Sequence, residues 1–226
     1  MKFFGFALLV LVGIHLANAV RTKCEVSFDN EYKDKPDSDW KFDKQYDYFG
    51  KVSKENHLSR TGPMESLEGK INEQINKELL AHYTYTSIAA HFGRDDISLP
   101  GFQKFFKKAA AEEAEHAQMF MEYQNKRGGQ IKLRQIPAPF RQQWGSALMA
   151  MEDALCLEKK ILDSLKKVHR AAENANDVQM MDFIEGKFLN EQIEGIKILS
   201  NYVNTLKRVG GGLGEYEVDK NLLNQK

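Results

Sequence analysis

The sequence GQIKLRQIPAPFRQQ, residues 129–143, separates two pairs of long helical patterns and decides the fold of this chain. Pro137 and Pro139 favour an extended backbone, so the segment can reach roughly 50 Å at about 3.3 Å per residue. A helix of the length expected here spans about 43 Å at 1.5 Å per residue. The segment is therefore long enough to cross a helical bundle from one end to the other.

The helical patterns on either side of this segment are bounded by turn-forming residues. Two helices are expected at about 64–92 and 99–127, two more at 144–173 and 178–209, and a short one at 215–223. The joints within each pair are short, so each pair forms an antiparallel hairpin. The sequence therefore predicts an all-α four-helix bundle with one long crossover and a short fifth helix.

The charges of the chain balance, so no net electrostatic field attracts polyanionic partners. The 226 residues carry 32 Lys and Arg against 32 Asp and Glu. We therefore expect no nucleic-acid partner and no membrane partner, and any cation chemistry must come from specific acidic sites.

The first 56 residues differ from the rest. Residues 1–19 combine Lys2, a mostly apolar run and the small-residue pattern Ala17-Asn18-Ala19, which is typical of a secretory signal peptide. A membrane anchor is the alternative, but the run is shorter than the roughly 20 residues that span a bilayer. We expect a secreted protein, with an irregular extension at 20–56 and the main domain at 57–226.

Each long helix carries an apolar seam that is interrupted near its middle by a polar side chain able to bind metal. A buried carboxylate without a partner costs several kcal/mol, so three of them in one core indicate a cation. A shifted helix phase, with each residue on a solvated face, is the alternative. Oxygen ligands with one imidazole favour iron or manganese. The residues are Glu78, Glu113, His116, Glu158 and Gln192.

Two histidine patterns qualify this site. Glu113 and His116 form the one Glu-x-x-His pair of the seams, whereas a symmetric di-iron oxygenase would use two. His82 falls on the same seam as Glu78, one turn later, and is interpreted as a hydrogen-bonded core histidine.

Several motifs resemble animal heavy-chain ferritins, from about His57 to Leu223. They are Ile75-Asn76-Lys77-Glu78, Arg94-Asp95-Asp96, Glu112-Glu113-Ala114-Glu115-His116-Ala117, Gln124-Asn125-Lys126-Arg127-Gly128-Gly129 and Phe188-Leu189-Asn190-Glu191-Gln192. The resemblance implies a ferritin-like diiron domain, a ferroxidase that stores iron in a cage of twenty-four subunits, either homomeric or mixed with light-type subunits. Ferrous iron and dioxygen would be its substrates.

The resemblance also implies roles for individual residues. Glu78, Glu113 and His116 would bind a first iron, and Glu113, Glu158 and Gln192 a second, with Tyr85 assisting oxidation. A three-fold pore would be lined by Asp182 and Glu185, with His169 outside them. Glu112 and Glu115 would guide iron to the cavity, although the third expected glutamate is Gln118 here.

Two cysteines are too few for a disulfide scaffold. Cys24, in the extension, is predicted to pair with another subunit, and a free or capped thiol is the alternative. Cys156, on the third helix, is expected to be an occluded thiol and a poor partner for Cys24.

Overall fold

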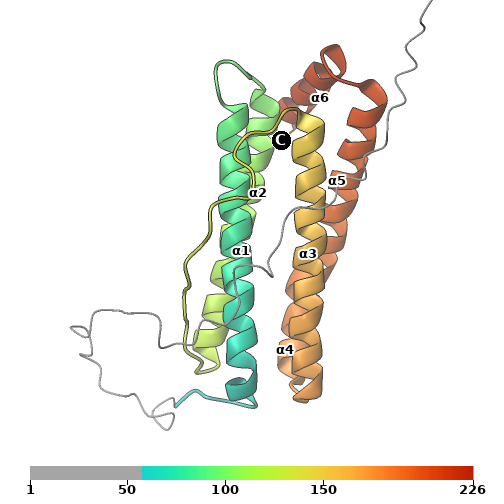
Figure 1. The fold of residues 1–226 in the computed structure, drawn as a ribbon. Helices are drawn as coiled ribbons and strands as arrows, with labels where there is room; N and C mark the ends of the chain where they lie inside the picture. The colour runs from blue at the N-terminus through green and yellow to red at the C-terminus, as the bar shows by residue number, and fades with distance from the viewer. Residues whose placement is uncertain (1–57, 226) are drawn as a thin grey trace, which may run out of the picture.

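A computed structural model describes residues 58–225, and all of its regular elements are helices (Figure 1). The predicted signal peptide and extension lie outside the described residues. The all-α four-helix bundle with one crossover and a short fifth helix is confirmed. The elements are α1 (Met64–Phe92), α2 (Pro100–Lys126), α3 (Ala147–Asn174), α4 (Val178–Ile184), the π-helical turn η4 (Glu185–Leu189), α5 (Asn190–Val209) and α6 (Leu213–Asn224).

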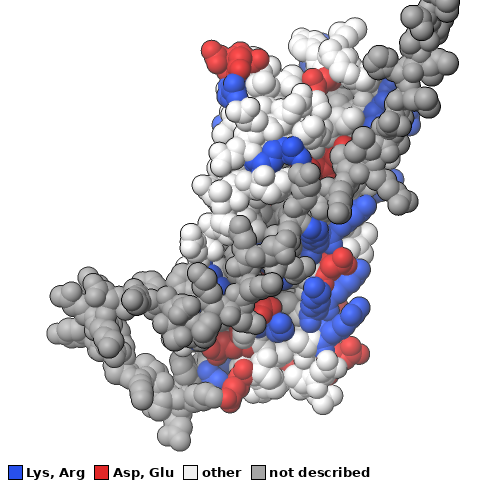
Figure 2. Space-filling model, in the orientation of Figure 1, with Lys and Arg blue, Asp and Glu red and all other residues white. Residues whose placement is uncertain are grey.

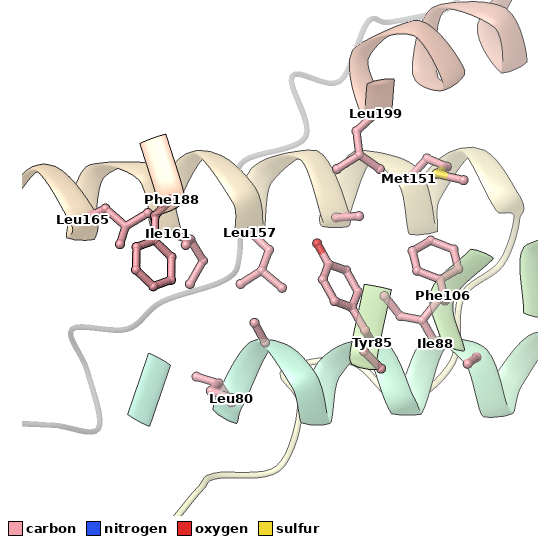
Figure 3. Close-up of a cluster of buried hydrophobic side chains, with 14 of the residues drawn as sticks. Leu80, Tyr85, Ile88, Phe106, Met151, Leu157, Ile161, Leu165, Phe188 and Leu199 are labelled. Atoms are coloured by element: carbon pink, nitrogen blue, oxygen red, sulfur yellow. The ribbon is translucent and has the colours of Figure 1, made fainter. Parts of the chain in front are cut away.

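Side chains from all four long helices meet in one core (Figure 3). Phe106 of α2 stacks on Phe92 of α1 with ring centroids 5.9 Å apart. Each fully buried large apolar side chain contributes about 1.5–3 kcal/mol relative to an exposed one. None of the described helices is long and apolar enough to span a bilayer.

The surface seen in Figure 2 is mixed in charge. Lys and Arg side chains gather along α3, with acidic side chains between them.

The fourth long helix contains a π-helical turn that the sequence analysis did not predict. Its buried residues Met180, Ile184, Phe188 and Gln192 recur every four residues. An α-helix turns once every 3.6 residues, so this spacing drifts away from the core. The wider turn of η4 absorbs the drift, because a π-helix has more residues in each turn. As a result Phe188 and Gln192 both face inward.

Two buried asparagines of α1 hold the crossover against the bundle. The Asn72 side chain accepts from the backbone N–H of Lys132 at 2.8 Å and donates to the carbonyl of Gln130 at 3.0 Å. One turn later, Asn76 Oδ1 accepts from the backbone N–H of Arg134 at 2.9 Å. An extended segment has no internal hydrogen bonds, so these side chains satisfy backbone groups that α1 would otherwise bury.

Side chains of the tail helix α6 cap helices of the bundle, and a bundle side chain caps α6. Asp219 Oδ1 accepts from the backbone N–H of Phe102, near the start of α2, at 2.9 Å. Glu215 Oε1 accepts from the N–H of Ala147, at the start of α3, at 2.7 Å. In return Lys104 Nζ donates to the carbonyl of Leu223, near the end of α6, at 2.9 Å. Carboxylates at helix starts and an ammonium at a helix end both match the helix dipole.

The close contact between α2 and α6 predicts a large effect for Gly101→Ala. A Cβ at Gly101 would lie 1.8 Å from the carbonyl oxygen of Asp219. The backbones must then separate, at a cost of about 1–3 kcal/mol, which is typical of overpacking. Faster proteolysis of α6 and a lower unfolding midpoint are expected. Gly69→Ala is the control, because nothing lies within 4 Å of its Cβ. Equal proteolysis of the two variants would contradict this packing.

Cys156 differs from its prediction. It is half-buried and disulfide-bonded, so it is not an occluded thiol. The chain has one other cysteine, Cys24, which lies outside the described residues. The expectation of an occluded thiol at Cys156 is therefore wrong, and the pairing of Cys24 stays a prediction. The periodicity of α3 placed residue 156 too close to the bundle interior, whereas it lies on the flank of the helix.

Candidate metal centre

Three predicted ligands meet at the middle of the α1–α2 pair. Each of Glu78, Glu113 and His116 offers one ligand atom, and these atoms all lie within 4.8 Å of one another. All three side chains are buried, and Glu78 is completely so. Glu113 and His116 are three residues apart on α2, so both point across the same helical turn toward Glu78. Within residues 58–225 no other group of acidic, histidine or cysteine residues has such a geometry.

Two carboxylate oxygens in this group have no hydrogen-bond partner. They are Oε2 of Glu78 and Oε2 of Glu113, and both are buried. Glu113 Oε2 lies 3.8 Å from His116 Nδ1, which is beyond hydrogen-bond distance. An unsatisfied buried acceptor costs about 1–3 kcal/mol or more if it is charged. A divalent cation among these atoms would remove that cost, so the donor set fits a metal ion.

The remaining predicted residues form a second group beside the first. Tyr85 of α1 donates its hydroxyl to Glu158 Oε1, and Gln192 of α5 donates its amide to Glu158 Oε2. Figure 3 shows the Tyr85 hydroxyl pointing toward α3, which carries Glu158. All three side chains are buried. The structure therefore brings together all six residues predicted for the centre, one or two from each long helix.

Burial shifts the protonation of the carboxyl groups. Burial, and then the nearby Glu113 carboxylate, raise the pKa of Glu78 well above its ordinary value. Burial and Glu158 do the same to the pKa of Glu113, and burial raises the pKa of Glu158. Metal binding to such groups must displace protons, because a ligand carboxylate is ionised. The folded protein is thus destabilised when these carboxyl groups are ionised and no cation is bound between them.

This destabilisation predicts that Glu78→Gln stabilises the metal-free protein. The folded-state pKa of Glu78 lies above its unfolded value, so its contribution becomes unfavourable as pH rises through the folded pKa. Glutamine keeps an oxygen for the hydrogen bond from Gln74 but carries no charge. Calorimetry of demetallated protein should show a midpoint raised by about 2–4 °C per kcal/mol relieved, more at neutral than at acid pH. A variant less stable than its parent at both pH values would contradict the burial of an ionisable group here.

Glu191 and His82 lie close to this centre. Glu191 Oε2 lies 3.5 Å from His116 Nε2, on an exposed side chain beside Gln192. The sequence analysis gave Glu191 no role, because it lies off the inward face; its position next to Gln192 was the available signal. The hydrogen bond predicted for His82 is confirmed, since its Nδ1 hydrogen-bonds the Ala110 carbonyl at 2.7 Å, but the side chain is half-buried and not part of the core.

A pocket of about 620 Å³ opens beside the centre, between α2, α5 and α6. Tyr85 and Glu158 of the centre form part of its wall. The other lining residues are both apolar and charged, among them Phe105, Leu199, Tyr202, Lys108, Glu112, Glu191 and Glu194. The pocket therefore gives the second group of residues a route to the surface.

The residues assigned to a pore and to iron guidance lie on the surface. His169 Nε2 hydrogen-bonds Glu185 Oε1 at 2.6 Å, and Asp182 is exposed one turn before Glu185. Glu112 forms an ion pair of 3.2 Å with Lys108, while Glu115 is exposed. A single chain thus brings His169 and Glu185 into contact.

Comparison with known proteins agrees with this geometry. The ferritin-like domain family matches residues 68–209. Soma ferritin of Lymnaea stagnalis is 54% identical over 69% of this chain and 90% of its own length. The ferritin heavy chain of Echinococcus granulosus is 49% identical over 74% of this chain and 96% of its own. Chloroplastic ferritin-3 of Glycine max is 45% identical over 80% of this chain and 76% of its own length. The chain therefore belongs to the ferritin family, as a subunit of the heavy-chain type.

Proposed function

We propose that this chain oxidises ferrous iron with dioxygen and stores the ferric product inside a cage of twenty-four subunits. The observation that carries the proposal is the pair of unpartnered carboxylate oxygens on Glu78 and Glu113 beside His116. Ferrous iron is a substrate of suitable chemistry, because carboxylates and imidazole both bind it. Relatives named as ferritin heavy chains support the same assignment.

Each of the two groups of residues binds one ferrous ion. Glu78, Glu113 and His116 bind one ferrous ion, while Glu113, Glu158 and Gln192 bind the second. Two ferrous ions held side by side can supply two electrons to one dioxygen. The protein contributes ligand geometry and a shielded pocket. Tyr85, hydrogen-bonded to Glu158, holds that carboxylate in place beside the second ion.

Rapid mixing with iron tests the activity directly. Purified protein given two ferrous ions per subunit should oxidise them with one dioxygen for each pair, far faster than buffer does. Oxidation at the rate found in buffer would leave a structural cage subunit as the alternative. Size-exclusion chromatography with iron analysis tests the cage, and mass spectrometry of the native particle shows whether light-type subunits are present.

The pocket beside the centre favours one second candidate, a di-iron oxygenase acting on an organic substrate. Phe105, Leu199 and Tyr202 make part of its wall apolar, as in many small-molecule sites. The charged residues Lys108, Glu112, Glu191 and Glu194 favour passage of cations instead. Dioxygen consumption that needs an added organic compound, with iron unconsumed, would support the oxygenase.

The surface acids Asp182 and Glu185 are proposed to line a three-fold pore in the cage. Asp182→Asn with Glu185→Gln should slow iron uptake at limiting iron and low ionic strength, because a ring of carboxylates attracts cations. Oxidation at saturating iron should remain unchanged, since neither residue contacts the centre. Equal uptake by variant and parent under limiting iron would reject the pore.

We also propose that the chain is secreted after cleavage behind Ala19. The disulfide of Cys156 supports this, since disulfides persist mainly in oxidising compartments. Mass spectrometry of the mature N-terminus tests the cleavage site. A chain that begins at Met1 in the native material would contradict it.

A further inference from the structure

A chain of buried polar side chains leads from the metal centre across to α3. Gln74 of α1 donates from Nε2 to Glu78 Oε1 at 2.6 Å. Ser164 of α3 donates from Oγ to Gln74 Oε1. Lys77 of α1 donates from Nζ to Ser164 Oγ at 2.8 Å. Gln74 and Ser164 are both buried, and neither belongs to the residues that bind iron in the proposed function.

The direction of every bond in this chain is fixed by chemistry. An ammonium group can only donate, so the Ser164 oxygen accepts from Lys77 and its proton is left to donate. The proton goes to the Gln74 carbonyl oxygen, which turns the Gln74 amide nitrogen toward Glu78. Glu78 Oε1 accepts this hydrogen bond, so the direction of the chain agrees at every step from Lys77 to Glu78. Hydrogen bonds aligned in one direction polarise and strengthen one another in a buried site.

This chain of hydrogen bonds occupies one carboxylate oxygen of Glu78 and leaves the other free to bind a cation. Oε1 accepts from Gln74, whereas Oε2 has no hydrogen-bond partner. Oε2 is therefore the atom offered toward Glu113 and His116. A long glutamate side chain has several rotamers, and anchoring one oxygen removes the entropy cost of choosing the binding rotamer.

We propose that Gln74, Ser164 and Lys77 are positioning residues that set the affinity of the first cation site by holding Glu78 in its binding orientation. This inference rests on the proposed function only in naming iron as the natural occupant. Such outer hydrogen bonds typically change metal affinity by about 10–100-fold. Glu158 and Gln192 do not belong to this chain of hydrogen bonds, so the second site should keep its affinity for metal.

Zinc binding to the purified protein tests the proposal without oxidation. Calorimetric titration of metal-free Ser164→Ala with Zn²⁺ should show first-site binding weakened by about 10-fold, at the low end of that range. Ser164→Thr keeps the hydroxyl and should restore the parental affinity. In ferrous oxidation, Ser164→Ala should raise KM with kcat retained at saturating iron.

The role of Lys77 is tested against a matched lysine. Lys77→Met should weaken zinc binding in the parent but not further in the Ser164→Ala background, because the proposed link from Lys77 to Glu78 runs through the Ser164 hydroxyl. Lys70→Met removes the same charge from an exposed ion pair with Glu73 two turns away and should leave affinity unchanged. Circular dichroism and particle size should match the parent for all variants.

Distinct outcomes separate this inference from the proposed function. Parental zinc affinity in Ser164→Ala, or equal weakening by Lys70→Met and Lys77→Met, overturns the positioning chain. A protein that oxidises no iron but still loses zinc affinity in Ser164→Ala refutes the proposed function alone and leaves the chain standing.

Discussion

Replacing Glu113 and His116 together with alanine is expected to abolish rapid ferrous oxidation and to leave the cage intact. Both side chains point into the bundle, and Glu113 is the residue shared by the two proposed iron sites. Removing it leaves Glu78 and Glu158 without a common neighbour, so neither iron keeps its full ligand set. The expected loss is of the whole rapid phase, because residues that act as one unit do not contribute additively.

The same substitutions should not destabilise the fold. Glu113 is a buried carboxyl whose pKa is raised by burial, and its Oε2 has no hydrogen-bond partner, so its removal relieves an unfavourable burial. Gln118→Ala with Glu122→Ala on the exposed face of α2 is the matched control, since that pair hydrogen-bonds only at the surface. Stopped-flow oxidation should separate the two variants completely. A double variant at Glu113 and His116 that oxidises iron at the parental initial rate would place the chemistry elsewhere.

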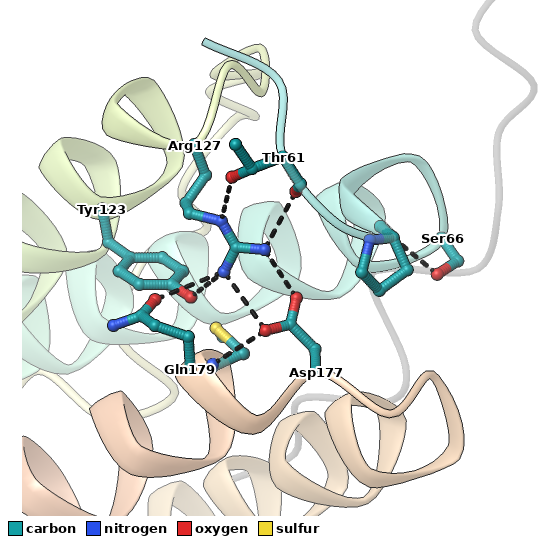
Figure 4. A network of polar contacts seen from close by, with 8 residues as sticks. Thr61, Ser66, Tyr123, Arg127, Asp177 and Gln179 are labelled. Atoms are coloured by element: carbon teal, nitrogen blue, oxygen red, sulfur yellow. Dashed lines mark hydrogen bonds and ion pairs between the residues drawn. The ribbon is translucent and has the colours of Figure 1, made fainter.

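The second large effect is expected at Arg127, whose substitution by methionine should cost about 3–5 kcal/mol of folding free energy. Arg127 follows the last residue of α2 and is buried. Figure 4 shows its guanidinium between Thr61, Tyr123 and Asp177. Nη2 donates to Asp177 Oδ2 at 2.7 Å and to the Thr61 carbonyl at 2.9 Å. Nε donates to Thr61 Oγ1 at 2.9 Å, and Nη1 reaches the Tyr123 hydroxyl. One side chain thus joins α2, the segment before α1 and the start of α4.

The cost comes mainly from the partner that is left behind. Asp177 is 5% exposed, and its Oδ1 also caps α4 by accepting from the Met180 N–H at 3.0 Å. Burial opposes ionisation of Asp177, but hydrogen bonds from Arg127 hold its pKa below the ordinary value. A depressed carboxyl pKa stabilises the fold above the unfolded pKa, and this stability is lost as pH falls through the folded value. The effect of Arg127→Met should therefore be full at neutral pH and smaller in acid.

Denaturant unfolding at neutral pH measures this difference. Arg94→Met is the matched control, because Arg94 and Asp96 form an exposed ion pair, which solvent screens and which should contribute little to stability. Combining Arg127→Met with Asp177→Asn should recover part of the loss, since asparagine carries no charge and its Oδ1 can still accept from the Met180 N–H. Similar midpoints for Arg127→Met and Arg94→Met would show that the buried network adds nothing.

The helices and the crossover could be predicted because their signals are local. The turn-forming residues at 94–96, 128–129 and 174–177 and the two prolines set the boundaries within a few residues. The start of α3 moved from 144 to 147 because Ser146 accepts from the Met149 N–H at 3.2 Å and caps the helix there. The π-helical turn was missed, because it depends on a four-residue spacing that becomes strained only when the helix is packed.

The candidate site could be predicted where residues share a helical face. Glu113 and His116 are fixed by their spacing, and the resemblance placed Glu158 and Gln192 opposite them. Which of two adjacent apolar residues of a helix faces inward cannot be read from that helix alone: in α3, Ile161 is buried whereas Leu162 is half-buried. Long-range contacts, such as Gln74 with Ser164 and Asn72 with the crossover, required the tertiary structure.

The central claim is that iron binds between the four helices and not only at surface acids. Anomalous diffraction at the iron edge, from crystals loaded with ferrous iron without oxygen, tests it most directly. Two iron peaks per subunit are predicted, one bounded by Glu78, Glu113 and His116 and the other by Glu113, Glu158 and Gln192. Both should vanish in the variant with alanine at positions 113 and 116. Iron peaks confined to surface carboxylates such as Asp182 and Glu185, with none inside the parental bundle, would contradict the account.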